Sequence, residues 1–353
     1  MNKKLFVILS VLLSFALVLA SCGNRNENNN TGTPGASNTP QPTASGKPFQ
    51  GDRIGMTAKV VGLKGPTAMG MVRLFTEIDS LSDLVSLEFD IVSSPDVITA
   101  GLINGDITVA AVPTNVAAML YNKLEGNIRM LAVNTFGVIH IVADKSLNIE
   151  TMDDLRGKTI TATGKGTVPE YVLNYILEKN GMVPGTDVTI EYRSDHSELA
   201  TLVAQGEIEI AMLPEPFVSI ATGINENIEL AIDLTDEWKK VSPEGSELTM
   251  GCLISTAEFA ETYPQEVVEL LAFYNTSVNW VNSEPEKAAE LIVLFNILPD
   301  TETAVRAIPG SNIRFVFSQN SKEMLNAFYK VLYDYDPRSI GGSIPGDDFY
   351  FTP

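Results

Sequence analysis

The stretch that decides the fold is Gly105-Asp106-Ile107-Thr108-Val109-Ala110-Ala111-Val112-Pro113, which returns 101 residues later as Gly206-Glu207-Ile208-Glu209-Ile210-Ala211-Met212-Leu213-Pro214. Each copy contains a glycine, an acidic residue, an apolar run with β-branched side chains, and a proline. The glycine is typical of a helix end, and the apolar run predicts a buried strand that the proline ends. The repeat therefore predicts two copies of one α/β unit.

The pattern extends upstream of each copy, where a strand runs into a glycine turn and a helix. Alternating strands and helices predict a mostly parallel sheet with helices on its faces. We therefore expect two similar lobes, and the alternative is one larger α/β domain in which the similarity is accidental. The expected strands are 59–63, 87–92, 158–162 and 188–192, and the expected helices are 71–78, 95–104, 172–177 and 197–205.

Further apolar runs connect the two units. Residues 129–133, 137–143 and 248–255 predict strands, and the last two lie where the chain would cross between the lobes. The helical periodicity of 264–282 and 321–333 predicts a tail that packs back on the first lobe. The expected division is lobe 1 at 51–143 and 252–353, and lobe 2 at 144–251.

The N-terminal segment has the pattern of an export signal. Lys3 and Lys4 precede an apolar run at 5–20, which suits a signal peptide and is short for a membrane span. The run leads into Leu19-Ala20-Ser21-Cys22, which resembles a bacterial lipobox. Residues 1–21 are therefore expected to be a lipoprotein signal peptide and Cys22 the lipidated residue. The alternative is a plain secretory signal. Residues 22–50 are polar and rich in Asn, Thr, Gly, Pro and Ser, which predicts a disordered tether.

Composition excludes several functions. The 353 residues carry a formal charge of −20, which disfavours nucleic-acid binding because phosphate contacts need a basic face. Two cysteines and two histidines offer little for a disulfide framework or a metal site, and we expect no metal and no cofactor. Cys252 lies in an apolar context and is expected to be a buried, inert thiol. Catalytic motifs such as G-x-S-x-G and H-E-x-x-H are missing from the sequence, which favours a binding protein over an enzyme.

Ligands of open α/β sheets bind beyond the carboxyl ends of the strands, and the free N–H groups of helix starts can donate to them. The turns and strand ends of both units are therefore the candidate ligand contacts. Several have structural alternatives: Thr167 as a helix cap, Lys165 as a solvated charge, Phe136 and Phe217 as core residues, and Glu215 as an exposed charge. The candidates are Gly65, Pro66, Thr67, Ala68, Met69, Thr114, Asn115, Asn134, Thr135, Phe136, Gly164, Lys165, Gly166, Thr167, Glu215 and Phe217.

Roughly residues 56–350 resemble the solute-binding lipoproteins of ABC importers, and most of all the nitrate/sulfonate/taurine and thiamine-pyrimidine-precursor binding proteins. The resemblance is carried by three stretches, with further similarity in the tail from Asp336 to Tyr350. The stretches are Asp106-Ile107-Thr108-Val109-Ala110-Ala111-Val112-Pro113-Thr114-Asn115, Asp154-Leu155-Arg156-Gly157-Lys158-Thr159-Ile160 and Pro214-Glu215-Pro216-Phe217. The resemblance implies a two-lobed type II periplasmic-binding-protein-like α/β fold with two interlobe crossings.

The same resemblance implies a function without catalysis. A small solute would be captured in the cleft between the lobes by hinge closure and delivered to ABC permease subunits. The protein would be a monomer, lipid-anchored through Cys22 on the extracytoplasmic face of the cell membrane. The candidate loops contain one lysine and no arginine, which favours a sulfonate/taurine-like or pyrimidine-like solute over a multiply charged anion. The alternatives are an extracellular lipoprotein enzyme and a sensory ligand-binding module that use the same cleft.

Overall fold

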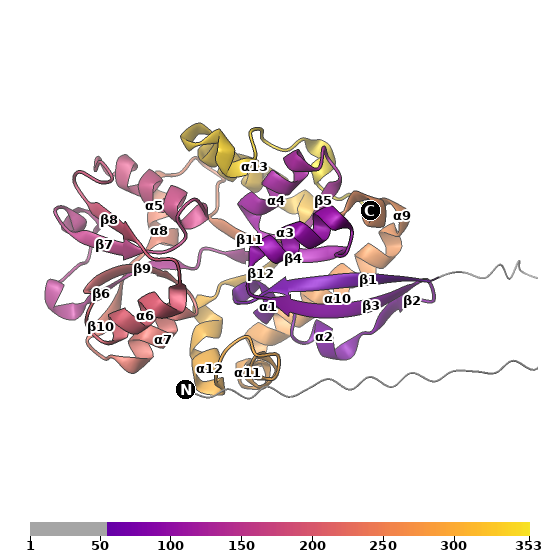
Figure 1. Cartoon of the computed structure of the whole chain (residues 1–353), viewed down its shortest axis with the longest axis horizontal. Coiled ribbons are helices and arrows are strands. Elements are labelled where there is room, and N and C mark those ends of the chain that lie inside the picture. The colour runs from indigo at the N-terminus through magenta and orange to yellow at the C-terminus, as the bar shows by residue number, and fades with distance from the viewer. Residues whose placement is uncertain (1–54) are drawn as a thin grey trace, which may run out of the picture. The chain divides into compact units, whose positions relative to one another are not determined.

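The computed structural model describes residues 55–353 (Figure 1). The expected signal peptide (1–21) and the tether with Cys22 (22–50) lie outside the described residues. Within 55–353, no helix combines the length and the apolar character needed to span a membrane.

The first of two sheets has seven strands in the order β12-β5-β11-β4-β1-β3-β2. Strand β1 is parallel to β3 and β4, and β11 is antiparallel to β4 and β5. The bounds are β1 Met56–Leu63, β2 Ser80–Ser82, β3 Val85–Val92, β4 Val109–Pro113, β5 Ile128–Phe136, β11 Thr249–Thr256 and β12 Ile313–Phe317.

The second sheet repeats this plan with five strands in the order β10-β6-β9-β7-β8. Here β7 is parallel to β8 and β9, and β6 is antiparallel to β9 and β10. The series β3-β1-β4-β11-β5 and β8-β7-β9-β6-β10 therefore match position by position, as the sequence repeat predicts. The expectation that each sheet is mostly parallel is wrong: both sheets are mixed, because β11 and β6 run antiparallel to both of their neighbours. The bounds are β6 Ile139–Asp144, β7 Thr159–Ala162, β8 Thr189–Tyr192, β9 Ile210–Pro214 and β10 Ile228–Asp233.

We call the first sheet with its helices lobe 1 and the second lobe 2. Helices α5–α8 surround the second sheet, and the other helices surround the first, as Figure 1 shows. The C-terminal helices α10 and α13 pack on the first sheet, as expected. The helix bounds are α1 Pro66–Met69, α2 Leu74–Glu77, α3 Pro95–Asn104, α4 Thr114–Lys123, α5 Val168–Lys179, α6 His196–Ala204, α7 Phe217–Ile224, α8 Leu234–Val241, α9 Ala257–Thr262, α10 Pro264–Ser283, α11 Pro285–Leu294, α12 Thr301–Gly310 and α13 Ser318–Tyr335.

The expected helix at 71–78 is shortened to the single turn α2, and α1 is a separate turn before it. Ser277 of α10 provides the physical reason. Its hydroxyl donates to the Gly70 carbonyl at 2.8 Å and accepts from the Leu74 N–H at 3.3 Å. The Ser277 side chain thereby replaces backbone bonds that would continue one helix through this segment.

The lobes are joined where the chain leaves β5 for β6 and where it leaves α8 for β11. Because β6 belongs to the second sheet, the change of sheet falls between Phe136 and Ile139, earlier than the expected division at 143/144. Because β11 belongs to the first sheet, the return falls before Thr249, earlier than the expected 251/252. The apolar runs before and after the first crossing, β5 and β6, are both almost wholly buried, so their composition does not mark the point of that crossing.

Candidate ligand-binding cleft

A cavity of about 580 Å³ lies between the two lobes. Its walls follow the carboxyl ends of β1 and β3 in lobe 1 and of β8 and β9 in lobe 2, where the fold rule places ligands. A loop after α11 closes one side. The lining residues are Lys64, Gly65, Ser93, Val293, Asn296, Ile297, Leu298 and Pro299 from lobe 1, and Asp195, His196, Ser197, Pro216, Phe217 and Ile220 from lobe 2.

A second cavity of about 550 Å³ belongs to lobe 2 alone. It includes Lys158 and Thr159 at the beginning of β7 and Glu209 just before β9. This position, largely at the amino ends of the strands, is opposite to the one that α/β sheets use for ligands. We therefore take the interlobe cavity as the candidate site and call it the cleft.

Two aromatic side chains form one wall of the cleft. The rings of Phe217 and His196 stack with their centroids 5.2 Å apart and an interplanar angle of 26°. The Nδ1 atom of His196 shares a hydrogen bond with the Thr163 hydroxyl. Burial lowers the pKa of His196, so its ring is neutral near pH 7. The wall is therefore a flat and uncharged π surface.

Glu215 lies beside this wall at the start of α7, where the Glu215–Pro216 peptide bond is cis. Its carboxylate accepts hydrogen bonds from the backbone N–H and the hydroxyl of Ser219, at 3.1 and 3.0 Å. Burial raises the pKa of Glu215 to about 7, and the Ser219 bonds only partly oppose this. A Cβ atom on Gly310, at the end of α12 in lobe 1, would lie 2.7 Å from Glu215 Oε1. Glu215 is thus a buried acid at the contact between the lobes.

The candidates Thr67, Asn134 and Thr135 meet in lobe 1 around Gly251. A Cβ atom at Gly251 would lie 2.7 Å from Asn134 Oδ1 and 2.7 Å from Thr67 Cγ2. The hydroxyl of Thr135 donates to Asn134 Oδ1 at 3.1 Å, and the hydroxyl of Thr67 donates to the Leu63 carbonyl at 2.6 Å. All three are buried and none lines the cleft.

Other candidates of lobe 1 hold the lobe together. Thr114 donates to the Thr249 carbonyl at 2.7 Å, and Asn115 donates to the Ser339 carbonyl at 3.3 Å. Ala68 and Met69 are fully buried in α1. Phe136 lies in the first crossing, with the guanidinium carbon of Arg314 3.5 Å from its ring centroid.

The glycine turn before α5 uses its own polar groups. The Gly166 N–H donates to the Glu170 carboxylate, and the Thr167 hydroxyl donates to the Gly164 carbonyl. Lys165 is exposed, with its ammonium 5.6 Å from the ring centroid of Tyr192. None of these turn residues lines the cleft.

Of the predicted contacts, Gly65 and Phe217 therefore line the cleft directly. Sequence reasoning missed Ser93, Asp195 and His196, although each follows an expected strand at its carboxyl end. That position was the available signal for all three. The loop after α11, by contrast, lies outside the repeated units and gives no such signal.

Part of the chain matches a known protein family. Residues 85–228 match the family model described as the phosphonate periplasmic substrate-binding protein of ABC transporters. One curated relative, YtlA of Bacillus subtilis (strain 168), is 31% identical over 80 residues, which cover 23% of this chain. The match spans only 24% of the length of that relative.

Solved structures extend the likeness across the described chain. An ABC transporter protein from Parabacteroides distasonis has a TM-score of 0.71 and 20% identity, over 83% of this chain and 98% of its own. The aliphatic sulphonate binding protein SsuA from Escherichia coli has a TM-score of 0.65 and 14% identity, over 82% and 97%. The alkanesulfonate-binding protein SsuA from Xanthomonas axonopodis pv. citri, bound to MOPS, has a TM-score of 0.59 and 15% identity, over 79% and 93%.

The two sheets and these matches define the class of fold: a two-lobed α/β fold similar to that of binding proteins of ABC transporters, with residues 85–228 matching a periplasmic substrate-binding family model. The resemblance expected from the sequence, to the group that includes the sulfonate-binding proteins, is confirmed, and so is the two-lobed α/β fold. The family model and both SsuA structures are named for substrate or sulfonate binding.

Proposed function

We propose that this protein captures a small organic solute in the cleft and delivers it to the permease of an ABC importer. The observation that carries the proposal is the cavity of about 580 Å³ at the carboxyl ends of strands from both sheets. A solute in this position contacts both lobes at once. It therefore stabilises the closed arrangement to the extent that it binds that arrangement more tightly than the open one.

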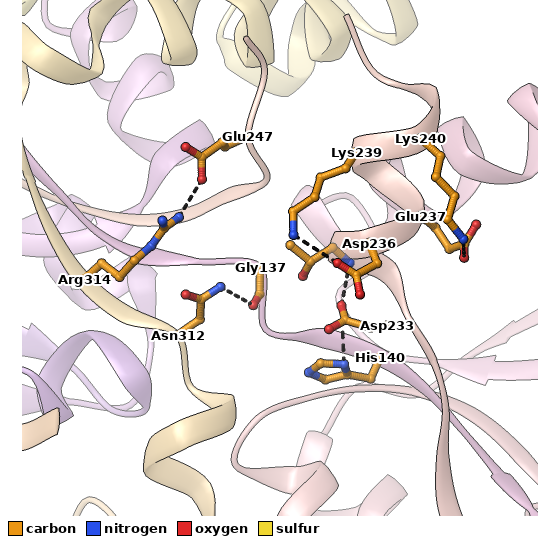
Figure 2. Close-up of polar contacts among 11 residues, drawn as sticks. Gly137, His140, Asp233, Asp236, Glu237, Lys239, Lys240, Glu247, Asn312 and Arg314 are labelled. Carbon is orange, nitrogen blue, oxygen red and sulfur yellow. Dashed lines mark hydrogen bonds and ion pairs between the residues drawn. The ribbon is translucent and has the colours of Figure 1, made fainter. Parts of the chain in front are cut away.

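The two crossings between the lobes form the hinge of this mechanism (Figure 2). Arg314 of β12 pairs with Glu247 in the second crossing at 2.6 Å and lies over the ring of Phe136 in the first. Asn312 donates to the Gly137 carbonyl at 3.1 Å. Residues 312–314, at the start of β12 in lobe 1, thus contact both crossings, and these contacts keep the two crossings side by side while the lobes rotate.

We infer further that the protein is a monomer held on the extracytoplasmic face of the membrane by a lipid on Cys22. A lipid anchor with a tether at 22–50 would keep the receptor near its permease. The solute classes proposed are those that the sequence favours, a sulfonate/taurine-like or a pyrimidine-like compound. Lys64 is the single Lys or Arg among the residues that line the cleft, which supports a solute without multiple negative charges.

A thermal-shift screen with sulfonates, taurine, pyrimidines, nitrate and amino acids tests the proposal. A ligand at 100 times its dissociation constant adds about 2.7 kcal/mol to the native state, which a melting curve detects. Ser197→Trp places an indole in the cleft and should abolish the shift. Ser283→Trp, at the exposed end of α10, is the matched control and should leave it unchanged. Turnover of a panel compound without any shift would instead favour the enzyme alternative.

A further inference from the structure

We propose that the cleft accepts flat neutral or cationic solutes and disfavours anions. The inference rests on the proposed function, because it takes the cleft as the solute site, and it chooses between the solute classes left open above. It separates this chain from proteins of the same fold whose names refer to sulfonates.

In lobe 2, N–H groups at the starts of the two helices beside the cleft, α6 and α7, are already occupied by carboxylates of the chain. Asp195 accepts from the Glu198 N–H at the start of α6 at 2.7 Å, and Glu215 accepts from the Ser219 N–H near the start of α7 at 3.1 Å. An anionic solute would have to displace these carboxylates and then remain close to them. Helix starts favour negative charge, and here the protein supplies that charge itself.

Lobe 1 does not compensate with positive charge. Among the residues that line the cleft, the positive charge of Lys64 is matched by the negative charge of Asp195. The buried acid Glu215 immediately precedes the lining residue Pro216 in the chain. The hydroxyl of Thr67 is committed to the Leu63 carbonyl, and Ser94 accepts from the Asp96 N–H at 3.2 Å as the cap of α3. The wall of the cleft therefore carries no net positive charge.

The aromatic stack adds a preference for shape. Phe217 and His196 both line the cleft and stack on each other, so a planar solute would extend this stack from an outer ring face. The negative face of an aromatic ring also attracts a cation. A planar solute with N–H donors, neutral or positively charged, would meet both the π surface and the nearby carboxylate of Asp195.

Three probes of equal shape and different charge test the inference: benzamidinium, benzamide and benzoate. We would measure their dissociation constants by isothermal titration calorimetry at pH 8 and low salt. We expect benzamidinium to bind about tenfold more tightly than benzoate, because the carboxylates of Asp195 and Glu215 attract the cation and repel the anion, with benzamide between them. The ratio should shrink at 1 M salt, where charges are screened within about 3 Å.

Substitutions that remove charge and keep the hydrogen bonds connect the preference to the carboxylates. Asp195→Asn preserves the helix cap, because Asn caps as well as Asp, and Glu215→Gln preserves an acceptor for Ser219. The double variant should bring the benzamidinium-to-benzoate ratio close to one. Glu258→Gln, an exposed change on α9, is the control and should leave the ratio as it is.

The possible outcomes separate the two proposals. Tighter binding of benzoate that Ser197→Trp abolishes would overturn the charge preference and leave the cleft as the solute site. Tighter binding of benzamidinium that persists in the double variant would overturn the role of the carboxylates. Binding of none of the probes, or binding that Ser197→Trp does not affect, would count against the cleft and so against both proposals.

Discussion

Glu215→Gln should stabilise the protein at pH 8 relative to the wild type and have a much smaller effect at pH 4.5. The reason is that burial raises the pKa of Glu215 from its ordinary value of 4.5 to about 7. A group with a raised pKa binds more protons in the folded state than in the unfolded state. The free energy of unfolding therefore falls as the pH rises from 4.5 through 7. Glutamine cannot ionise, so the variant does not lose this stability.

The difference between the two pKa values sets the size of the effect. Each tenfold change in proton affinity is worth about 1.4 kcal/mol, so the ionised wild type loses about 3 kcal/mol at pH 8. For a protein of this size we expect the melting temperature to shift by roughly 6 °C, at about 2 °C per kcal/mol. The amide itself can also change the stability by an amount that does not depend on pH. That amount cancels, because the prediction compares the difference in unfolding free energy between variant and wild type at two pH values.

The assay is urea unfolding of the wild type and Glu215→Gln at pH 4.5 and pH 8. Glu258→Gln serves as the control, since an exposed carboxyl should give a difference that changes little between the two pH values. A difference between wild type and Glu215→Gln that is equal at both pH values, within about 0.5 kcal/mol, would refute the reasoning. It would show that Glu215 is hydrated in solution and that the contact with α12 does not exclude water.

Three further changes probe the cleft, the buried polar cluster of lobe 1 and the hinge. Phe217→Ala should weaken solute binding at least tenfold in calorimetry and change the unfolding midpoint little, because the side chain is half-buried at the edge of the cleft. Gly251→Ala should destabilise lobe 1 by about 1–3 kcal/mol in urea, since its Cβ would lie 2.7 Å from Asn134 Oδ1; an unchanged midpoint would show that the cluster has room to relax. Arg314→Ala should cost about 1 kcal/mol by loss of the Glu247 pair and the aromatic contact, and salt should reduce the difference.

The strands of the repeat could be predicted because each is determined locally. A short apolar run between a glycine and a proline is compatible with few structures other than a buried strand. Strands β4 and β9 form where the repeat predicts them. The crossings were less predictable, because a strand buried in one sheet has the same composition as a strand buried in the other. The actual change of lobe depends on pairing partners far along the chain, such as β6 with β9.

The interrupted helix after β1 had no local signal at all. Its residues are apolar and compatible with a helix over 71–78, and Met71 and Val72 are fully buried. The interruption depends on Ser277, which is more than 200 residues away in the sequence and bonds to both sides of the break. Tertiary contacts of this kind override local propensity.

The candidate site shows the same division between local and distant causes. The glycine turns and helix starts were predicted from sequence, and the cleft lies beside several of them. Whether a backbone N–H group is free for a solute depends, however, on which side chain reaches it. Asp195 and Glu215 each lie within four residues of the N–H that they accept from, so a helix-capping analysis could have shown them as competitors for the solute. Counting the N–H donors at strand ends therefore overestimates the affinity of such a cleft for anions, and the carboxylates within one helical turn must be counted with them.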